Sequence, residues 1–236
     1  MSISHMHHAP APLLTQEALA TVAHELRDPL AAVLFALEAL PSDIDPDVRR
    51  ARSIAQHQAR RAVQIVDDLF ELCAASQDRL HLHKEVVELA VIVAGATEVT
   101  AHLLAAREHR LTVSLPNSPV FLSADPLRLE QVLTNLLANA AKYTDPGGYI
   151  RLTAEAEPGE IVLRVRDNGR GIPPELLSRL FERFWQGSAK NAAGGIGLGL
   201  ALVKSLVELH GGSVAAYSDG LGAGAEFIVH LPTNLI

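Results

Sequence analysis

The sequence contains little cysteine, few aromatic residues and no excess of positive charge. Its single cysteine, Cys73, excludes a disulfide framework and any metal site built from several cysteines. Acidic residues outnumber basic residues by 27 to 20, and the formal charge of −7 argues against nucleic acid or an anionic membrane as the main partner. These absences favour a protein of a reducing compartment, and we expect it to be cytoplasmic.

Long hydrophobic runs are also missing. None approaches the roughly 18–20 residues that a membrane-spanning helix requires, and the longest, Leu30–Leu37, falls within a helical pattern. The N-terminus is polar and rich in His, unlike a signal peptide. We therefore expect no direct membrane span in this chain, and a membrane anchor elsewhere in the protein if the chain is a fragment.

The composition that remains is globular, 48% hydrophobic, and sufficient for one large domain or two small ones. Residues 1–12 lack periodicity and resemble a disordered, tag-like terminus. Over residues 13–77 the apolar positions alternate between steps of three and four, which is the pattern of a helical bundle. The first stripe is Leu19, Val22, Leu26, Pro29, Val33, Ala36 and Leu40, and the second is Ala55, Ala59, Ala62, Val66, Leu69 and Cys73.

The turn at Pro41–Pro46 separates the two stripes and predicts an antiparallel helical hairpin. Because a lone hairpin buries little apolar surface, we expect it to dimerise into a four-helix bundle.

Residues 78–236 alternate between strand-like and helix-like patterns, which predicts an α/β two-layer sandwich. The fold class is therefore α+β with two domains, a helical hairpin followed by the sandwich. The predicted strands are Leu80–Val87, Arg110–Leu115, Val120–Ser123, Tyr149–Ala156, Ile161–Asp167, Ser213–Ser218 and Ala225–Leu231. The predicted helices are Leu89–Arg107, Pro126–Tyr143, Pro173–Leu180 and Ile196–His210.

Three polar segments of the sandwich suggest chemistry, although each has a plain structural interpretation. The glycines of Gly195–Leu200 precede a helix and suit either a flexible loop or an anion at a helix N-terminus. Asp167–Pro173 follows a predicted strand. It either presents a functional carboxylate at the strand end or forms a plain turn before a helix. Asn135 and Asn139 lie four residues apart and share a helix face. They are either ligands for Mg²⁺ or ordinary surface amides. No P-loop, dinucleotide fingerprint or protein-kinase signature is present.

Together with two further segments, these motifs resemble the core of a bacterial sensor histidine kinase, in that family's order. The resemblance covers residues 13 to 232 and implies a dimerisation and phosphotransfer hairpin followed by a Bergerat-type ATP-binding domain. The matching segments are His24–Leu30 (H box), Asn135–Tyr143 (N box), Asp167–Pro173 (first Gly box), Leu180–Phe184 (F box) and Gly195–Leu200 (second Gly box).

For the hairpin, the resemblance implies that His24 accepts the phosphoryl group and that Glu25 orients its ring and takes its proton. Counting Leu19 as heptad position a places His24 at position f, which points out of the bundle. Pro29 removes a backbone N–H from the helix and predicts a kink below His24. Asp28 stands where many family members carry Thr or Asn, which leaves kinase activity intact and puts phosphatase activity in doubt.

For the sandwich, the resemblance implies an ATP site closed by a short lid at Trp185–Gly195. Asp167 would accept a hydrogen bond from the adenine amine, with Gly169 and Gly171 clearing space for the base. Asn139 would ligate Mg²⁺, with Asn135 near the phosphates and Lys142 paired with their charge. The remaining implied contacts are Tyr143 and Phe184 at the nucleotide, and Gly195, Gly197 and Gly199 at the phosphates.

The expected function is that of a protein-histidine kinase core that uses Mg-ATP to phosphorylate His24 and transfers the phosphoryl group to an aspartate of a response regulator. The expected partners are a second copy through the hairpin and a receiver domain. Two alternatives are a related Bergerat-fold ATPase and a pseudokinase scaffold that binds a regulator without chemistry.

Overall fold

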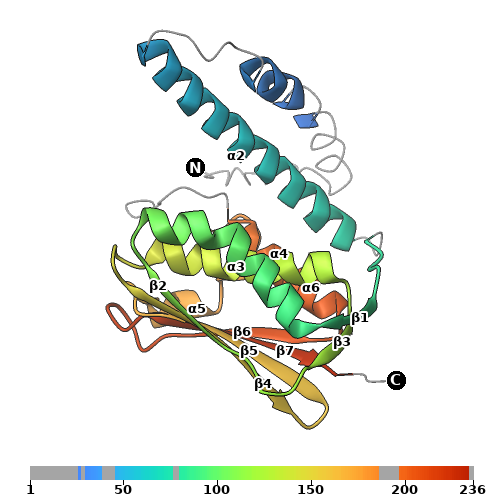
Figure 1. Cartoon of the computed structure of the whole chain (residues 1–236). Coiled ribbons are helices and arrows are strands. Elements are labelled where there is room, and N and C mark those ends of the chain that lie inside the picture. Colours follow the sequence, from blue (N-terminus) through green and yellow to red (C-terminus); the bar gives the residue numbers. More distant parts are fainter. Residues whose placement is uncertain (1–25, 28–29, 39–45, 77–79, 186–196, 234–236) are drawn as a thin grey trace, which may run out of the picture. The chain divides into compact units, whose positions relative to one another are not determined.

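The chain divides into two compact units, Met1–Ala74 and Ala75–Ile236, in the computed structural model shown in Figure 1. The structure describes residues 26–27, 30–38, 46–76, 80–185 and 197–233. Several predicted features lie outside these ranges, namely His24, Glu25, Asp28, Pro29, Gly195 and the terminus at residues 1–12. The hairpin was predicted to end at residue 77, close to this division.

The first unit is an antiparallel helical hairpin. Residues 26–27 and 30–38 are helical, and the second helix is α2 (Pro46–Ser76). Arg27 Nε donates to Asp67 Oδ1 over 2.8 Å, and Arg60 Nη2 donates to Glu38 Oε1 over 2.9 Å. Because residues early in one helix contact residues late in the other, the two helices run in opposite directions.

The predicted apolar stripe of the first helix faces solvent in the single chain. Leu26 and Val33 are 46% and 49% exposed, and Ala36 is also exposed. Leu30, Leu34 and Leu37, which lie on a different face, are half-buried. The hairpin therefore leaves a row of apolar side chains uncovered along the first helix.

The second unit is built on a five-stranded mixed sheet with the order β2-β4-β5-β7-β6. Only β2 and β4 are parallel, and the other neighbouring pairs are antiparallel. A small antiparallel sheet pairs β1 with β3. The strands are β1 (Glu85–Glu88), β2 (Arg110–Ser114), β3 (Phe121–Ala124), β4 (Tyr149–Glu157), β5 (Glu160–Asp167), β6 (Ser213–Tyr217) and β7 (Ala225–Pro232).

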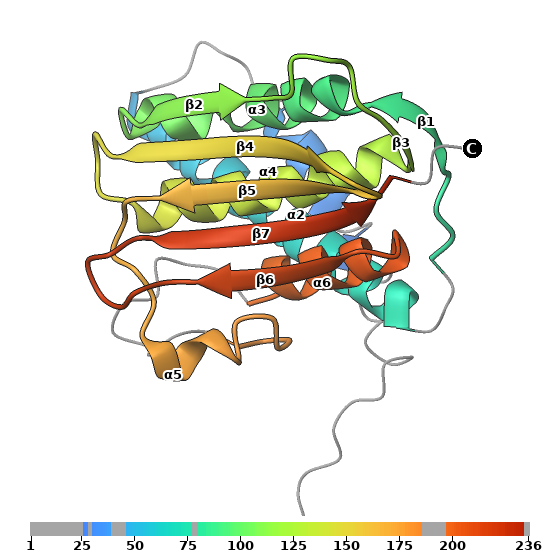
Figure 2. The same ribbon diagram turned by 90° about the horizontal axis from the view of Figure 1, so that it is seen from below.

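Helices α3 (Leu89–Ala106), α4 (Pro126–Tyr143) and α6 (Gly199–Leu209) cover one face of this sheet, as Figure 2 shows, and the short helix α5 (Pro174–Leu177) lies beside it. The alternation of β4 explains the layering, because Ile150 and Leu152 are buried under the helices whereas Arg151 between them is exposed. The architecture is the predicted two-layer sandwich.

The helix α4 has the predicted bounds, and two residues, an N-cap and a proline, define its start. Asp125 is the N-cap and accepts from Arg128 N over 3.2 Å, and Pro126 occupies the first turn, where it loses no hydrogen bond. Its apolar face, including Leu133, Leu136 and Leu137, is fully buried. This places the opposite, polar face of α4 at the candidate site.

Three predicted elements are clearly shorter in the structure. The helix expected at Pro173–Leu180 is limited to α5 (Pro174–Leu177) and is followed by turns. The strand expected at Leu80–Val87 is limited to Glu85–Glu88, because its partner β3 offers only four residues for pairing. The helix expected from Ile196 begins at Gly199, because Gly197 adopts a left-handed φ of 78° that a right-handed helix does not admit.

Within the described ranges, α3 is the one helix whose length and apolar composition would suffice to cross a membrane, with a mean hydropathy of 1.7. The sequence prediction found no such segment. Ile92, Val93 and Ala96 on its inner face are buried, and α3 packs against α4. Core packing thus accounts for the inner face of α3, whereas Val91, Val99 and Leu103 on its outer face are exposed.

Candidate nucleotide-binding site

The predicted site residues of the sandwich come from three elements that pack together, namely the second half of α4, the end of β5 and the start of α6. The structure brings Asn135 of α4 to the first residue of α6, since a Cβ placed on Gly199 would lie 3.1 Å from Asn135 Oδ1. The end of α4 meets the loop after β5, because Arg170 N donates to Tyr143 O over 3.1 Å. The N box and both Gly boxes therefore border one region.

Asp167 is the buried carboxylate of this region. It ends β5, is 6% exposed, and its Oδ1 accepts from Gly169 N over 2.8 Å. Burial raises the pKa of the Asp167 carboxyl above its ordinary value, and hydrogen bonds from the backbone of Gly169 and Ala225 and from the Thr144 side chain act in the opposite direction. Asp167 is thus fixed in place and can accept further hydrogen bonds from a ligand.

Thr144 adds a buried hydroxyl beside this carboxylate. A Cβ on Gly169 would lie 2.9 Å from both Asp167 Oδ1 and the α-carbon of Thr144, so the three residues adjoin. Thr144 Oγ1 is buried, lies near enough to Asp167 to lower the pKa of that carboxyl, and makes no hydrogen bond of standard geometry within the described part of the chain. A buried hydroxyl whose neighbouring acceptor is poorly aligned is costly, and this favours a polar ligand at Thr144 and Asp167. The sequence prediction missed Thr144, although it directly follows the N box.

The two asparagines of α4 differ in their surroundings. Asn135 contacts the start of α6, whereas the half-buried Asn139 makes no hydrogen bond with any described residue. Its amide oxygen is therefore available, and amide oxygens suit Mg²⁺ when phosphate and water complete the coordination.

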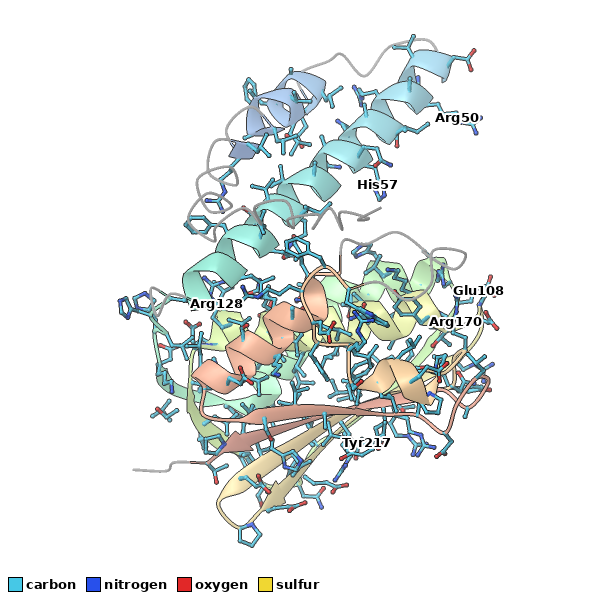
Figure 3. All side chains as sticks on the ribbon, turned by 180° about the vertical axis from the view of Figure 1, so that it is seen from behind. Arg50, His57, Glu108, Arg128, Arg170 and Tyr217 are labelled. Atoms are coloured by element: carbon cyan, nitrogen blue, oxygen red, sulfur yellow. The ribbon has the colours of Figure 1, made fainter. Side chains whose placement is uncertain are left out.

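Positive charge gathers around Tyr143, which is 38% exposed. Lys142 Nζ lies 4.7 Å from the centroid of the Tyr143 ring, and the guanidinium carbon of Arg170 lies 5.7 Å from it. Arg170, labelled in Figure 3, was not among the predicted site residues, although it stands within the first Gly box. The edge of the site is therefore cationic despite the net negative charge of the chain.

The glycines of the first Gly box are required by the protein's own packing. A Cβ on Gly171, whose φ is 69°, would overlap the carbonyl oxygen of Gly220, and one on Gly169 would overlap that of Tyr143. The sequence-based interpretation assigned these two glycines to clearance for the base. The structure shows that the space beside their α-carbons is occupied by neighbouring backbone.

The loop between β6 and β7 supports this Gly box and was missed by the sequence analysis. Ser218 Oγ accepts from Ile172 N over 2.9 Å and donates to Gly224 O over 2.6 Å. Gly224 N donates to Gly169 O over 3.1 Å. A signal was present, because Gly220, Gly222 and Gly224 recur at every second position before β7.

The residues that flank the expected lid, Phe184 and Gly197, are hydrogen-bonded to each other. Phe184 N donates to Gly197 O over 3.0 Å, and Phe184 adopts a left-handed φ of 60°. Phe184 is 50% exposed, whereas Phe181 packs edge-on against Phe227 with ring centroids 6.5 Å apart. Of these two F-box aromatics, Phe184 is the one available to a ligand.

These residues fit a purine nucleotide with a polyphosphate chain. The buried acceptor Asp167 and the Thr144 hydroxyl match the amine of an adenine ring. Lys142 and Arg170 offer positive charge to phosphates, and the open amide of Asn139 offers an oxygen to Mg²⁺. Each of these groups retains hydrogen-bonding capacity or charge that the described residues do not fully use, and a nucleotide would use it.

Comparison with known proteins agrees with this geometry. The His Kinase A (phospho-acceptor) domain matches residues 15–73. The domain described as histidine kinase-, DNA gyrase B-, and HSP90-like ATPase matches residues 124–235.

Among curated relatives, the "Probable sensor histidine kinase TcrY" of Mycobacterium tuberculosis is 38% identical over 92% of this chain and 45% of its own length. The sensor protein SrrB of Staphylococcus aureus is 32% identical over 93% of this chain and 38% of its own length. The chain thus spans less than half the length of these relatives.

Among solved structures, full-length ShkA in complex with AMPPNP superposes with a TM-score of 0.77 at 29% identity, covering 92% of this chain and 46% of that one. The mycobacterial sensor histidine kinase MprB gives a TM-score of 0.56 at 28% identity, over 65% of this chain and 99% of that one. The chain therefore belongs to the sensor histidine kinase family, as a catalytic core that joins a phospho-acceptor domain to an ATP-binding domain.

Proposed function

We propose that this chain uses Mg-ATP to phosphorylate itself on His24 and then passes the phosphoryl group to an aspartate of a response regulator. The observation that carries the proposal is the buried Asp167 carboxylate beside the Thr144 hydroxyl, in a chain whose hairpin matches the phospho-acceptor domain. The AMPPNP bound by the structural relative ShkA supports the same choice of ligand.

In the proposed site, Asp167 accepts from the adenine amine and Thr144 shares in holding that edge of the base. Lys142 pairs with phosphate, and the N-terminal end of α6 offers backbone N–H groups to it. Asn139 holds Mg²⁺, which when bound neutralises phosphate charge, and Asn135 lies near the phosphates. The remaining predicted contacts, Phe184, Gly195, Gly197 and Gly199, belong to the lid and its junction with α6.

The chemical step on the hairpin requires a nucleophilic ring nitrogen. A neutral imidazole carries a lone pair on one ring nitrogen, and His24 would attack with it. His24 forms a P–N bond to the γ-phosphorus as the bond from that phosphorus to the ADP oxygen breaks, and Glu25 takes the imidazole proton. The aspartate of the receiver domain then displaces His24 from phosphorus.

The uncovered stripe of the first helix supports a homodimer. Leu26, Val33 and Ala36 face solvent in the single chain, and a second copy would cover them in a four-helix bundle. We expect this part of the protein to work in the cytoplasm, where a receiver domain would meet His24.

The test is incubation of the whole chain with ATP labelled at the γ-phosphate. We expect a protein-bound label that is stable in base, labile in acid, absent from His24→Ala, and transferred to a receiver domain with an intact aspartate. ATP hydrolysis without label would support the related ATPase instead, and absence of both signals would support the scaffold. Asp28→Thr, with and without a phosphorylated receiver, tests whether Asp28 limits phosphatase activity.

A further inference from the structure

The C-terminal end of α4 requires hydrogen-bond partners at the place where it meets the nucleotide site. The last carbonyls of a helix have no partner within the helix, and burying them unpaired is costly. Thr144 N donates to Ala140 O over 3.0 Å, and Arg170 N donates to Tyr143 O over 3.1 Å. The carbonyls between and beyond these two need partners from another element.

Arg107 and His109, which follow α3, supply those partners. Arg107 Nη1 lies 3.2 Å from Ala141 O, 3.0 Å from Lys142 O and 3.3 Å from Thr144 O. The Nε2 atom of His109 lies 2.9 Å from Ala141 O, close enough to donate its hydrogen. One guanidinium thus joins three carbonyls of the segment that carries the cationic and adenine-facing part of the site.

The backbone around Arg107 is built to hold it there. Glu108 adopts a left-handed φ of 57°, unusual for a residue with a Cβ, and this turn lets the side chains on both sides of it reach Ala141. Gly147 N donates to Arg107 O and Arg110 N donates to Gly148 O, each over 2.9 Å. Figure 3 shows Glu108 and Arg170 at the same end of the unit.

We infer that Arg107 is a positioning residue of the nucleotide site. Arg107 donates to the carbonyls of Lys142 and Thr144, which flank Tyr143, and so fixes the backbone of these three residues. Its positive charge also complements the negative end of the α4 dipole. This inference rests on the proposed function, because it assumes that these three residues contact a nucleotide. Arg107, which lies outside the family motifs, thereby controls nucleotide affinity without contacting the nucleotide.

The experiment measures the dissociation constant of a fluorescent ATP analogue and the KM and kcat for ATP in His24 phosphorylation, using the full chain. For Arg107→Ala we expect the dissociation constant and KM to rise about tenfold, as loss of a charged hydrogen-bond donor predicts, with kcat within about twofold. Arg107→Lys keeps the charge and part of the hydrogen bonding, so we expect its affinity to recover to within about threefold of wild type.

Arg151→Ala is the matched control, because Arg151 is an exposed arginine on β4 that makes no polar contact with α4 among the described residues. We expect it to bind like wild type. Equal affinity in wild type, Arg107→Ala and Arg107→Lys would overturn the inference. So would a loss of thermal stability and kcat in both variants with KM unchanged, since that outcome belongs to a residue that only supports the fold.

Two further measurements separate this inference from the proposed function. If wild type binds no nucleotide, the proposed function fails together with the inference. If wild type binds and Asp167→Asn does not, the site is confirmed, and the behaviour of the Arg107 variants alone decides. If Arg107→Ala does not fold, the affinity of Arg107→Lys is the test of the inference. Affinity equal to that of wild type in Arg107→Lys would then overturn it.

Discussion

The two units of this protein use the same kinds of residues in different ways. The sandwich holds most of the buried apolar side chains of the described residues and pairs most polar groups of its core, leaving Thr144 Oγ1 and His109 Nδ1 as the buried side-chain atoms without partners within the described ranges. The hairpin, in its described part, places few side chains in the core, namely Ala59, Val66 and Leu72, and exposes apolar residues along its first helix. Most of the buried core thus lies in the sandwich, whereas the exposed row of the hairpin is the surface on which we expect a second chain.

The largest expected effect comes from the core of the sandwich. Leu152 lies at the centre of β4 and is fully buried, so Leu152→Ala leaves a cavity and lowers the free energy of unfolding of this unit by about 2–5 kcal/mol. Urea unfolding followed by the fluorescence of Trp185, the sole tryptophan, measures this unit. We expect the dimer to persist in sedimentation experiments, and simultaneous loss of dimer would contradict the independence of the two units.

The next effect tests the hairpin. Val33→Asp places a charge on the uncovered stripe, and we expect the dissociation constant of the dimer to rise at least about tenfold, because a buried valine contributes about 1.5–3 kcal/mol. Ala31→Asp, at an exposed position off the stripe, introduces the same charge and is the control. Analytical ultracentrifugation over a concentration series measures both, and equal weakening by the two variants would exclude the stripe as the interface.

One pH-dependent contribution to the stability of the sandwich comes from His210, whereas in the hairpin burial raises the pKa of Asp68 to about 6. His210 is buried, Asp125 N donates to its Nε2 over 3.1 Å, and its Nδ1 lies 2.8 Å from Leu206 O. Burial lowers the pKa of His210, helped by the charge of Lys84 and opposed by that of Asp125.

Because the folded pKa lies below the unfolded value of about 6.5, His210 contributes its full stability above that pH and loses it as the pH falls below it. We expect the wild type to lose more stability than His210→Gln between pH 7.5 and 5.5, by thermal unfolding. Parallel losses in the two proteins would assign the pH dependence to other groups.

The smallest effect is expected from the ion pair within the hairpin. Arg27 and Asp67 are 46% and 30% exposed, so water screens their attraction. We expect Asp67→Asn to change the free energy of unfolding by less than about 1 kcal/mol and to leave the dimer intact. Thermal unfolding at low and high salt measures this, and a larger loss would show that polar contacts hold the hairpin together as strongly as its apolar faces.

Much of the fold was predictable because local signals agreed with the tertiary structure. Helix α4 was predicted with its observed bounds, since an N-cap aspartate, a proline in the first turn and a continuous apolar face all mark the same element. The strand before α3 was predicted too long, because its length depends on the strand that pairs with it. The same holds for the site, where Asp167 and Asn139 lie in recognisable motifs whereas Thr144 lies outside them and is placed beside Asp167 by the fold.

The sequence by itself determined the two-domain organisation, the family and the residues that carry its motifs, because periodicity and motif order are written along the chain. Only the tertiary structure showed that the apolar stripe of the hairpin faces solvent and that Asp167, Thr144 and Asn139 are left with bonding capacity. It alone assigned Arg107 to the end of α4. The physical reason is that burial and hydrogen-bond satisfaction depend on which distant atoms meet, and the folded chain decides those meetings.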